Sequence, residues 1–227
     1  MTLVSVIIPA LNEAESIHQA ISAARRGYAP DEVEIIVVDG SSSDGTPGLV
    51  PPDVTLIRAL RGRAVQMNRG AATAQGEILL FCHADSQLPA GWREAVIEPL
   101  NRPSVSGGTF QTLILPARGI LRIRNSLTFP ADWKIMYGDQ VQFMRRVTFE
   151  QVGGFREIPL MEDVEMARAL HRVGRLVRVP LRVITSSRRF LERGPLRQWL
   201  ANTWRMIRYL YLGTAPERLA REYDGRG

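Results

Sequence analysis

Two aspartates, Asp39 and Asp85, each follow a short apolar segment with the composition of a buried strand. Ligands of a parallel α/β sheet bind at the carboxyl ends of its strands, so both carboxylates are expected to face one crevice. His83 stands two residues before Asp85 and points the same way if the segment is extended. Carboxylate and imidazole together can hold a divalent cation, which would neutralise the charge of a diphosphate. The pattern predicts metal-assisted chemistry on a phosphorylated small molecule.

Each of these side chains also has a plainer interpretation. Asp39 precedes Gly40, and Asp-Gly is common in turns. His83 fits an ordinary loop histidine, and Asp85 fits a partner for the start of the helix that contains Trp92. The pair of carboxylates at two strand ends is the more specific signal.

A third carboxylate, Asp163, follows Glu162 at the start of an apolar-periodic segment. Acidic residues are favoured at a helix N-terminus by the helix dipole, which is one explanation. The other is a general base that removes the proton of an acceptor hydroxyl as it attacks. One base and one metal suffice for an inverting displacement, and no Ser-His-Asp order or zinc motif offers a different chemistry.

Strands and helices alternate over the first hundred residues, which predicts a parallel sheet covered by helices. Strands are expected over 3–9, 33–38, 54–58 and 77–82. Helices are expected over 13–26 and 63–74, and from the segment at 88–90 to about residue 100. Asn12 is expected to cap the first of these helices.

After residue 101 strands and helices no longer alternate regularly. Strands are expected over 106–115, 138–145 and 176–184, the last interrupted at Pro180, and helices over 118–128, 162–173 and 195–212. Gly107-Gly108 and Gly138-Asp139-Gln140 interrupt strand-like segments and are expected beside the acceptor, although Asp139 also fits a turn.

No repeat, linker or change of composition divides the chain. We therefore expect one α/β domain over 1–227, with a mostly parallel sheet and a mixed second half. Within it we expect two functional halves and an amphipathic C-terminal helix region over 191–227.

Composition narrows the class of protein. The 227 residues are 45% hydrophobic and 23% charged, with a net charge of +6, and Lys134 is the only lysine. Arginine forks suit phosphates, although a coding bias explains the excess of arginine equally well. The basic residues form no concentrated stripe, which argues against nucleic acid. The sequence has no membrane-spanning run, no signal peptide pattern and one cysteine, Cys82, so we expect a cytoplasmic protein.

Several motifs occur in a characteristic order: SVIIPALNEAE, VVDGSSSDGT, RGRAVQMNRGA, ILLFCHADSQLP, YGDQVQFMRR, GGF and PLMEDVEMARAL. Over roughly residues 3–190 this set resembles family-2 glycosyltransferases of the GT-A fold. It is most similar to small bacterial members that carry His-Ala-Asp in place of Asp-x-Asp. The resemblance implies transfer of a sugar from a nucleoside diphosphate, commonly UDP, with Mg²⁺ or Mn²⁺ and with inversion.

The resemblance implies a nucleotide-binding half over 1–100 and an acceptor and catalytic half over 101–190. It also implies a role for each matching residue. Asp85 and His83 would hold the metal, and Asp163 would be the general base. The nucleotide would be bound by Pro9, Asn12, Glu13, Asp39, Arg63 and Gln66. The acceptor side would include Glu162, Gly108, Asp139, Arg188 and Arg189. Arg188-Arg189-Phe190 resembles a degenerate Q-x-x-R-W motif without its Gln and Trp, which argues against processive synthesis.

Three other classes of protein fit these motifs less well. A dinucleotide-binding enzyme would have G-x-G-x-x-G where this chain has Pro9-Ala10-Leu11-Asn12-Glu13. A nucleotidyltransferase would have a glycine-rich basic loop at that place. A non-catalytic nucleotide-sugar-binding protein would not need the acids at 39, 85 and 163.

The expected helix over 195–212 has one broad apolar face. That face either packs on the protein's own core or a twin subunit, or lies in a membrane interface. The second alternative would suit a lipid-linked acceptor and a peripheral position on the inner membrane face.

Overall fold

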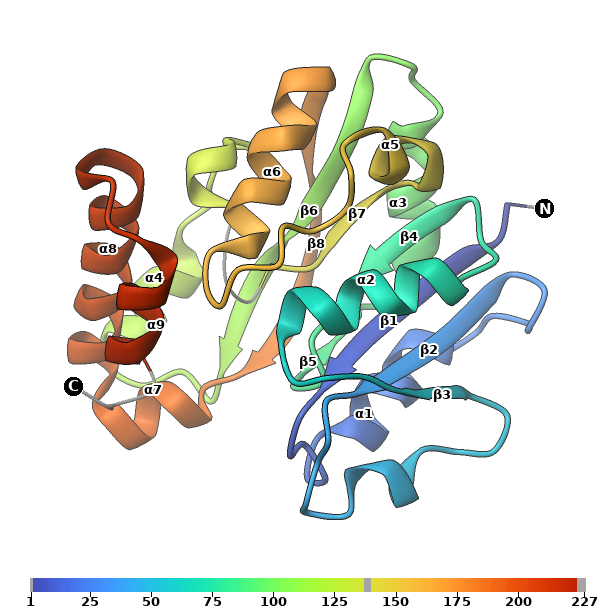
Figure 1. The fold of residues 1–227 in the computed structure, drawn as a ribbon, viewed down its shortest axis with the longest axis horizontal. Helices are drawn as coiled ribbons and strands as arrows, with labels where there is room; N and C mark the ends of the chain where they lie inside the picture. Colours follow the sequence, from blue (N-terminus) through green and yellow to red (C-terminus); the bar gives the residue numbers. More distant parts are fainter. Residues whose placement is uncertain (1, 137–139, 224–227) are drawn as a thin grey trace.

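The computed structural model describes residues 2–136 and 140–223, which form one eight-stranded sheet with helices on both faces (Figure 1). The order of strands across the sheet is β3-β2-β1-β4-β7-β6-β8-β5. The first four are mutually parallel: β3 (Thr55–Arg58), β2 (Val33–Asp39), β1 (Val4–Ala10) and β4 (Ile78–Phe81). Their carboxyl ends lie at one edge of the sheet. The predicted α/β domain with a mixed second half is confirmed.

Alternating side chains of the central strands supply two cores. Along β1, Val4, Val6 and Ile8 point to the face covered by α1 and α3, whereas Ile7 points to the face covered by α2, α5 and α6. The covering helices are α1 (Ile17–Arg25), α3 (Trp92–Leu100), α2 (Arg63–Thr73), α5 (Arg146–Gln151) and α6 (Glu162–Val173). The amphipathic pattern of each helix therefore sets the side of the sheet on which it packs.

Helix α2 packs unusually close to the sheet because Gly70 has no side chain. A Cβ at this position would stand 2.5 Å from Cγ2 of Ile7 and 3.0 Å from Cγ2 of Val38. This close packing determines where the first turn of α2, with Arg63 and Gln66, meets the carboxyl edge of the sheet.

The second half of the sheet is mixed. Its strands are β7 (Gln142–Arg145), β6 (Val105–Leu115), β8 (Arg175–Ser186) and β5 (Ser86–Gln87). Strand β7 is antiparallel to both β4 and β6, β6 is parallel to β8, and β5 is antiparallel to β8. The expected interruption at Pro180 is a bulge in a continuous strand, because the register jumps from Phe110–Val179 to Gln111–Arg182. Pro180 has no N–H to donate to a neighbouring strand, and it is tolerated because the bulge leaves this position unpaired.

A group of helices stands beside the far end of this half, at the left of Figure 1. It consists of α4 (Ile120–Ser126), α7 (Arg188–Arg193), α8 (Pro195–Leu212) and α9 (Pro216–Tyr223). Two short 3₁₀ turns, η1 (Thr46–Leu49) and η2 (Trp133–Ile135), complete the elements of the described part of the chain. Helix α8 has the predicted bounds, while α5, α7, α9 and β5 were not predicted. None of the helices in the described ranges is both long and apolar enough to cross a bilayer.

The prediction that Asn12 caps a helix from residue 13 was wrong. Helix α1 begins at Ile17, and Asn12 has a φ of 55°. Its side-chain oxygen accepts a hydrogen bond of 2.9 Å from the backbone N–H of Ser43. The side chain is thus used between two loops rather than within one helix, so the loop after β1 is tied to the loop after β2.

Candidate active site

Asp39 and Gln66, both predicted to bind the nucleotide, form hydrogen bonds with the backbone at the carboxyl edge of the sheet. The carboxylate of Asp39 is buried and accepts hydrogen bonds from the backbone N–H groups of Ser41 and Ser42, at 3.1 and 3.2 Å. The Gln66 amide donates to the carbonyls of Ala10 and Val38, each at 2.8 Å. Gln66 therefore braces the ends of β1 and β2, and Asp39 shapes the turn after β2.

The loop after β1 reaches the C-terminal helices through Glu13. Its carboxylate lies 3.2 Å from the guanidinium of Arg188, the first residue of α7. Its backbone N–H donates to the hydroxyl of Thr46 at 2.9 Å. Pro9 lies within β1, paired in register with Val38. Glu13 and Arg188 thus form an ion pair that ties the loop after β1 to α7.

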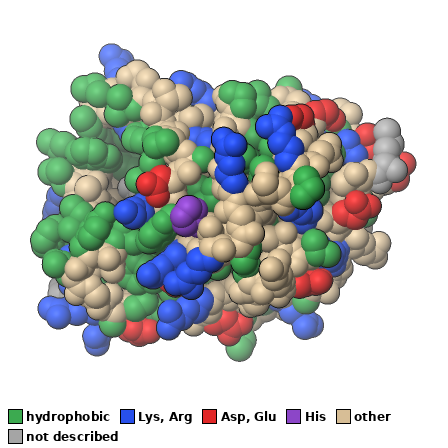
Figure 2. Space-filling model, turned by 90° about the horizontal axis from the view of Figure 1, so that it is seen from above, with side chains coloured by type: hydrophobic (Ala, Val, Ile, Leu, Met, Phe, Trp, Pro, Cys, Tyr) green, Lys and Arg blue, Asp and Glu red, His purple; other side chains and the backbone are tan. Residues whose placement is uncertain are grey.

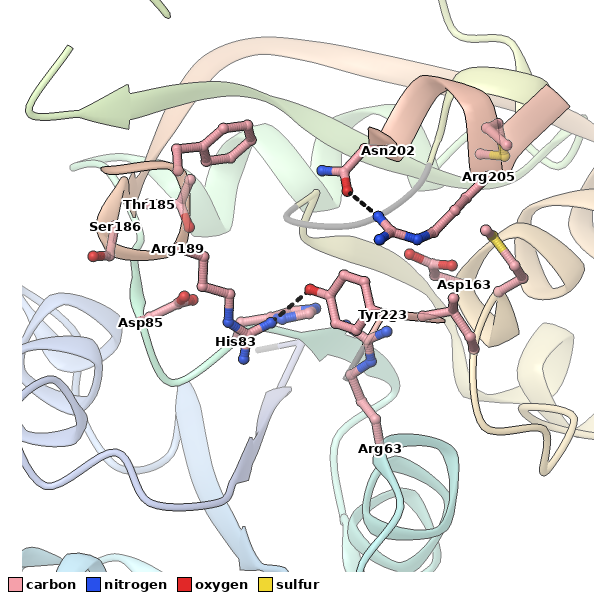
Figure 3. Close-up of a pocket in the computed structure, with 14 residues that line it drawn as sticks. Arg63, His83, Asp85, Asp163, Thr185, Ser186, Arg189, Asn202, Arg205 and Tyr223 are labelled. Atoms are coloured by element: carbon pink, nitrogen blue, oxygen red, sulfur yellow. Dashed lines mark hydrogen bonds between the residues drawn. The ribbon is translucent and has the colours of Figure 1, made fainter. Parts of the chain in front are cut away.

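A cavity of about 150 Å³ lies where the first hundred residues meet the rest of the chain (Figure 3). Arg63, His83 and Asp85 come from α2 and from the loop after β4. Asp163 comes from α6 and Arg189 from α7. The structure therefore brings together the predicted metal pair, the predicted base and two of the predicted arginines.

His83 and Asp85 supply a nitrogen and an oxygen donor. Burial, and then the nearby charge of Arg63, lowers the pKa of His83 to about 4, so the imidazole is neutral and its lone pair is available at pH 7. No third histidine, cysteine or acid completes a metal cluster among the described residues. Mg²⁺ and Mn²⁺ bind through one or two protein ligands when substrate phosphates supply the rest, so this donor set fits such a cation.

Cys82 is not a further ligand. Burial strongly raises the pKa of its thiol, with a smaller effect of Asp85 in the same direction. A protonated thiol is a poor metal ligand and nucleophile, and the side chain is part of the core.

Arg63 and Glu162 join the two sides of the cavity. The Arg63 Nε donates to a carboxylate oxygen of Glu162, whose side chain is 1% exposed. Burial alone would lower the pKa of Arg63, but the charges of Glu162 and Asp163 outweigh it, so the pKa is raised. A buried charge needs a partner of this kind, so the pair holds the start of α6 against α2.

Asp163 occupies the second position of α6. The residue before the helix, Met161, has a φ of 72°, and the backbone carbonyl of Asp163 accepts a hydrogen bond of 2.9 Å from Gln142. Asn12 and Ser41 are the other non-glycine residues with positive φ in the described ranges. Such conformations cluster at functional sites, and here all three lie in loops that border the carboxyl edge of the sheet.

Of the residues predicted on the acceptor side, Arg189 lines the cavity, whereas Gly108, Glu162 and Arg188 do not. Gly108 lies inside the sheet, where a Cβ would stand 2.5 Å from Phe143 and 2.6 Å from the carbonyl of Val177. It is a packing glycine. Asp139, with Gly138, lies outside the described residues.

Residues that the sequence did not indicate complete the wall. Asn202 and Arg205 come from α8 and Tyr223 from α9. The sequence shows that the helix has a polar face, but only the structure shows that this face turns toward the cavity. For Tyr223 the sequence offers no signal beyond its residue type.

Comparison with known proteins points to one family. The profile of Glycosyl transferase family 2 matches residues 5–156. "Probable glycosyltransferase YdaM" of Bacillus subtilis is 27% identical over 206 residues, covering 77% of this chain and 48% of that protein. "Beta-monoglucosyldiacylglycerol synthase" of Trichormus variabilis is 22% identical over 75% of this chain and 42% of that protein. The chain spans less than half the length of these relatives.

Solved structures share the fold. The mannosyltransferase PcManGT of Pyrobaculum calidifontis, in complex with GDP-Man and Mn²⁺, superposes with a TM-score of 0.63 at 24% identity, covering 81% of this chain and 56% of that one. S. aureus TarS 1-349, in complex with UDP-GlcNAc, gives 0.66 at 16% identity, covering 81% and 58%. The fold is therefore GT-A.

Proposed function

The chain belongs to glycosyl transferase family 2 and is a glycosyltransferase, and from this we propose that it moves a sugar from a nucleoside diphosphate to an acceptor hydroxyl, with inversion and without processive synthesis. One observation carries the proposal: Asp85 and His83, the arginine Arg63 and the acid Asp163 line a single cavity. Residues 1–100 bind the nucleotide, 101–190 present the acceptor, and 191–223 cover the site.

Donor binding uses the carboxyl edge of the sheet. The nucleoside lies against Pro9, Asn12 and Glu13, with Asp39 toward the base and UDP as the expected carrier. Asp85 and His83 would hold Mg²⁺ or Mn²⁺, which supplies charge neutralisation for the diphosphate. Arg63 adds a guanidinium fork on the same side, a group that suits phosphate oxygens.

Asp163 is the proposed base. It removes the proton of the acceptor hydroxyl while the oxygen bonds to the anomeric carbon and the bond to the diphosphate breaks. Attack on the face opposite the leaving group inverts the anomeric configuration. The paired neighbour Glu162 holds Arg63, so the two acids have different tasks.

Release of nucleoside diphosphate is the decisive measurement. Purified protein is incubated with UDP- and GDP-sugars, with and without Mn²⁺, and the free nucleotide is followed. Metal-dependent release of the diphosphate, retained in His171→Ala and lost in Asp85→Ala, supports the proposal. Release of pyrophosphate from a nucleoside triphosphate would indicate a nucleotidyltransferase, and binding without turnover would indicate a non-catalytic protein.

We propose that the protein binds a membrane surface through α8. A surface helix usually turns its apolar face toward the core, whereas α8 turns its polar face inward. Its polar residues Gln198, Asn202 and Arg205 face the protein, while Leu196 and Trp204 on the opposite face are each 54% exposed. The other exposed apolar side chains on this helix are Trp199, Leu200, Ile207, Tyr211 and Leu212. Figure 2 shows hydrophobic side chains gathered on this side of the molecule. The chain's own core therefore leaves this face uncovered.

A bilayer fits this face better than a second copy. Arg197, on α8 itself, and Arg122, on the neighbouring helix α4, are exposed, and guanidinium groups complement anionic headgroups. A symmetric dimer through α8 would bring the same arginines of two copies together. We place the protein at the cytoplasmic face of a membrane with a lipid-linked acceptor.

Flotation with vesicles tests the membrane contact. Trp204→Glu should reduce binding to vesicles that contain phosphatidylglycerol, whereas Leu60→Glu, an exposed apolar residue outside α8, should not. Unchanged flotation of Trp204→Glu would refute the contact. A concentration-dependent dimer lost in the same variant would instead indicate a subunit interface.

A further inference from the structure

Three arginines converge on Tyr223, which lines the cavity together with two of them, Arg189 and Arg205. Arg189 donates to the Tyr223 hydroxyl at 2.8 Å, and Arg193 donates to the Tyr223 carbonyl at 2.9 Å. The guanidinium carbons of Arg189, Arg193 and Arg205 lie 6.0, 5.8 and 5.2 Å from the ring centroid. Figure 3 shows the Tyr223 ring between Arg189 and Arg205.

The positive charge of this group is only partly balanced. Among the described residues, no carboxylate lies within ion-pair distance of any of the three guanidinium groups, and Glu222 pairs with Arg208 instead. The pKa of Arg205 is lowered, first by burial and then by the like charges of Arg193 and Arg208, with Tyr223 and Glu222 acting in the opposite direction. A phenol hydroxyl is an uncharged acceptor, so Tyr223 satisfies hydrogen bonds and leaves the charge in place.

Within the group, Arg205 lies on the acceptor side of the cavity, whereas Arg189 also interacts electrostatically with Asp85, a proposed metal ligand. Arg205 and Asn202 come from α8 and line the cavity together with Asp163, the proposed base. The donor side has its own cation, Arg63, from α2. An anion held by Arg205 would therefore stand beside the acceptor hydroxyl.

We infer that Arg189, Arg193 and Arg205 form a phosphate-binding subsite for the acceptor, in which Tyr223 occupies the position of the phosphate group in the empty protein. Guanidinium forks match phosphate oxygens in charge and geometry. This inference rests on the proposed function in one respect, namely that the ligand is the acceptor. The phosphate-binding subsite itself is inferred from the arginines.

Tyr223 must move for the subsite to fill. A cavity of about 150 Å³ is smaller than the roughly 300–1,000 Å³ of ordinary ligand pockets. Helix α9 is anchored by Leu219, fully buried in a cluster with Met161, Val164 and Met206. The anchor lies near the middle of α9 and Tyr223 is its last residue, so a shift of the last turn can open the subsite while the anchor stays in place.

Calorimetry on the full chain, with Mn²⁺ and saturating UDP or GDP, tests the subsite. The probes are glycerol 3-phosphate and dihexanoyl phosphatidic acid, with glycerol as the uncharged control. Arg205→Gln and Arg193→Gln should each weaken binding of the phosphate probes by roughly tenfold or more, the effect of one charged hydrogen bond. Arg172→Gln, an exposed arginine near the end of α6 that lies outside the cavity, should bind as the parent does. Tyr223→Ala should bind as tightly as the parent or more tightly.

Each other result has a definite meaning. Equal binding by all four variants would overturn the subsite, and loss of phosphate binding once nucleotide is present would assign the arginines to the donor. Stronger binding of the acylated probe would indicate a lipid phosphate, and equal binding would indicate a free one. A further outcome is that the parent protein binds the phosphate probes but no nucleotide, with Arg205→Gln still weakening the binding of those probes. That result would refute the proposed function and support the subsite. A thermal melt of each variant separates loss of binding from loss of folding.

Discussion

Arg63 of α2 donates a hydrogen bond to Glu162, the first residue of α6, across 99 residues of sequence. This buried pair joins the element proposed to bind the diphosphate to the helix that begins with the proposed base. Glu162 is therefore a positioning residue, because its carboxylate accepts the hydrogen bond from Arg63.

Glu162→Gln should therefore destabilise the protein and reduce activity. Removing one partner of a buried pair costs about 3–5 kcal/mol, and since Arg63 is 31% exposed a loss of about 2 kcal/mol is expected. Glu98→Gln is the matched control: its pair with Arg102 is exposed, so the change should be about 0.5 kcal/mol or less. Urea denaturation of both variants measures the difference, and equal midpoints would show that the buried pair adds no stability.

Asp163→Asn should leave donor binding nearly intact and lower turnover by about 10²–10⁴-fold, the usual contribution of a general base. Glu165→Gln, on the same helix but bonded to Tyr209 and outside the cavity, should retain most of its activity. Nucleotide affinity and single-turnover rates separate the two effects. If affinity collapses while bound donor reacts normally, Asp163 is a binding residue.

Asp85→Ala should abolish metal-dependent release of nucleotide, while His83→Ala should weaken metal affinity and retain measurable activity. The carboxylate is the harder ligand and the closer match to Mg²⁺ or Mn²⁺. Titration of Mn²⁺ by paramagnetic relaxation, in the presence of UDP, gives the affinity of each variant. Full activity of Asp85→Ala at low metal concentration would exclude this residue as the ligand.

Gly70→Ala tests the close packing of α2. Alanine is favoured over glycine inside a helix by about 1 kcal/mol. The new Cβ would stand 2.5 Å from Ile7, and overpacking costs about 1–3 kcal/mol. We expect net destabilisation of up to about 2 kcal/mol and reduced donor affinity through a displaced Arg63. Gly48→Ala, with no atom within 4 Å, is the control, and a stabilised Gly70→Ala would contradict the packing argument.

The helices and strands that the sequence predicted correctly are those whose residue pattern lies within one continuous segment. The apolar runs of β1 and β2 and the periodicity of α8 carry their own signal, so these elements lie where they were expected. Asn12 is the opposite case, because its partner is Ser43 in another loop and no local rule contains that contact. The Gln66 amide likewise serves two carbonyls that only the folded sheet brings together.

The cavity was partly predictable for the same reason. Strand ends point to Asp85, and an acidic helix start points to Asp163, each from its own segment. Tyr223 and Arg205 reach the site through the packing of α9 and α8, which depends on Leu219 and Met206 meeting the start of α6. Contacts between distant segments of this kind leave no periodic trace in the sequence.

The order of strands in the sheet has a consequence for folding during synthesis. Strand β4 has β1 on one side and β7 on the other, and β5 meets β8 through Ser86 and Thr185, which are 99 residues apart. The first hundred residues therefore leave the ribosome with the edge of β4 unpaired until residues 142–145 emerge. Such non-local pairing slows folding and leaves strand edges open to aggregation. Truncated chains that end before β7 should depend on chaperones, whereas chains that extend through α6 should not.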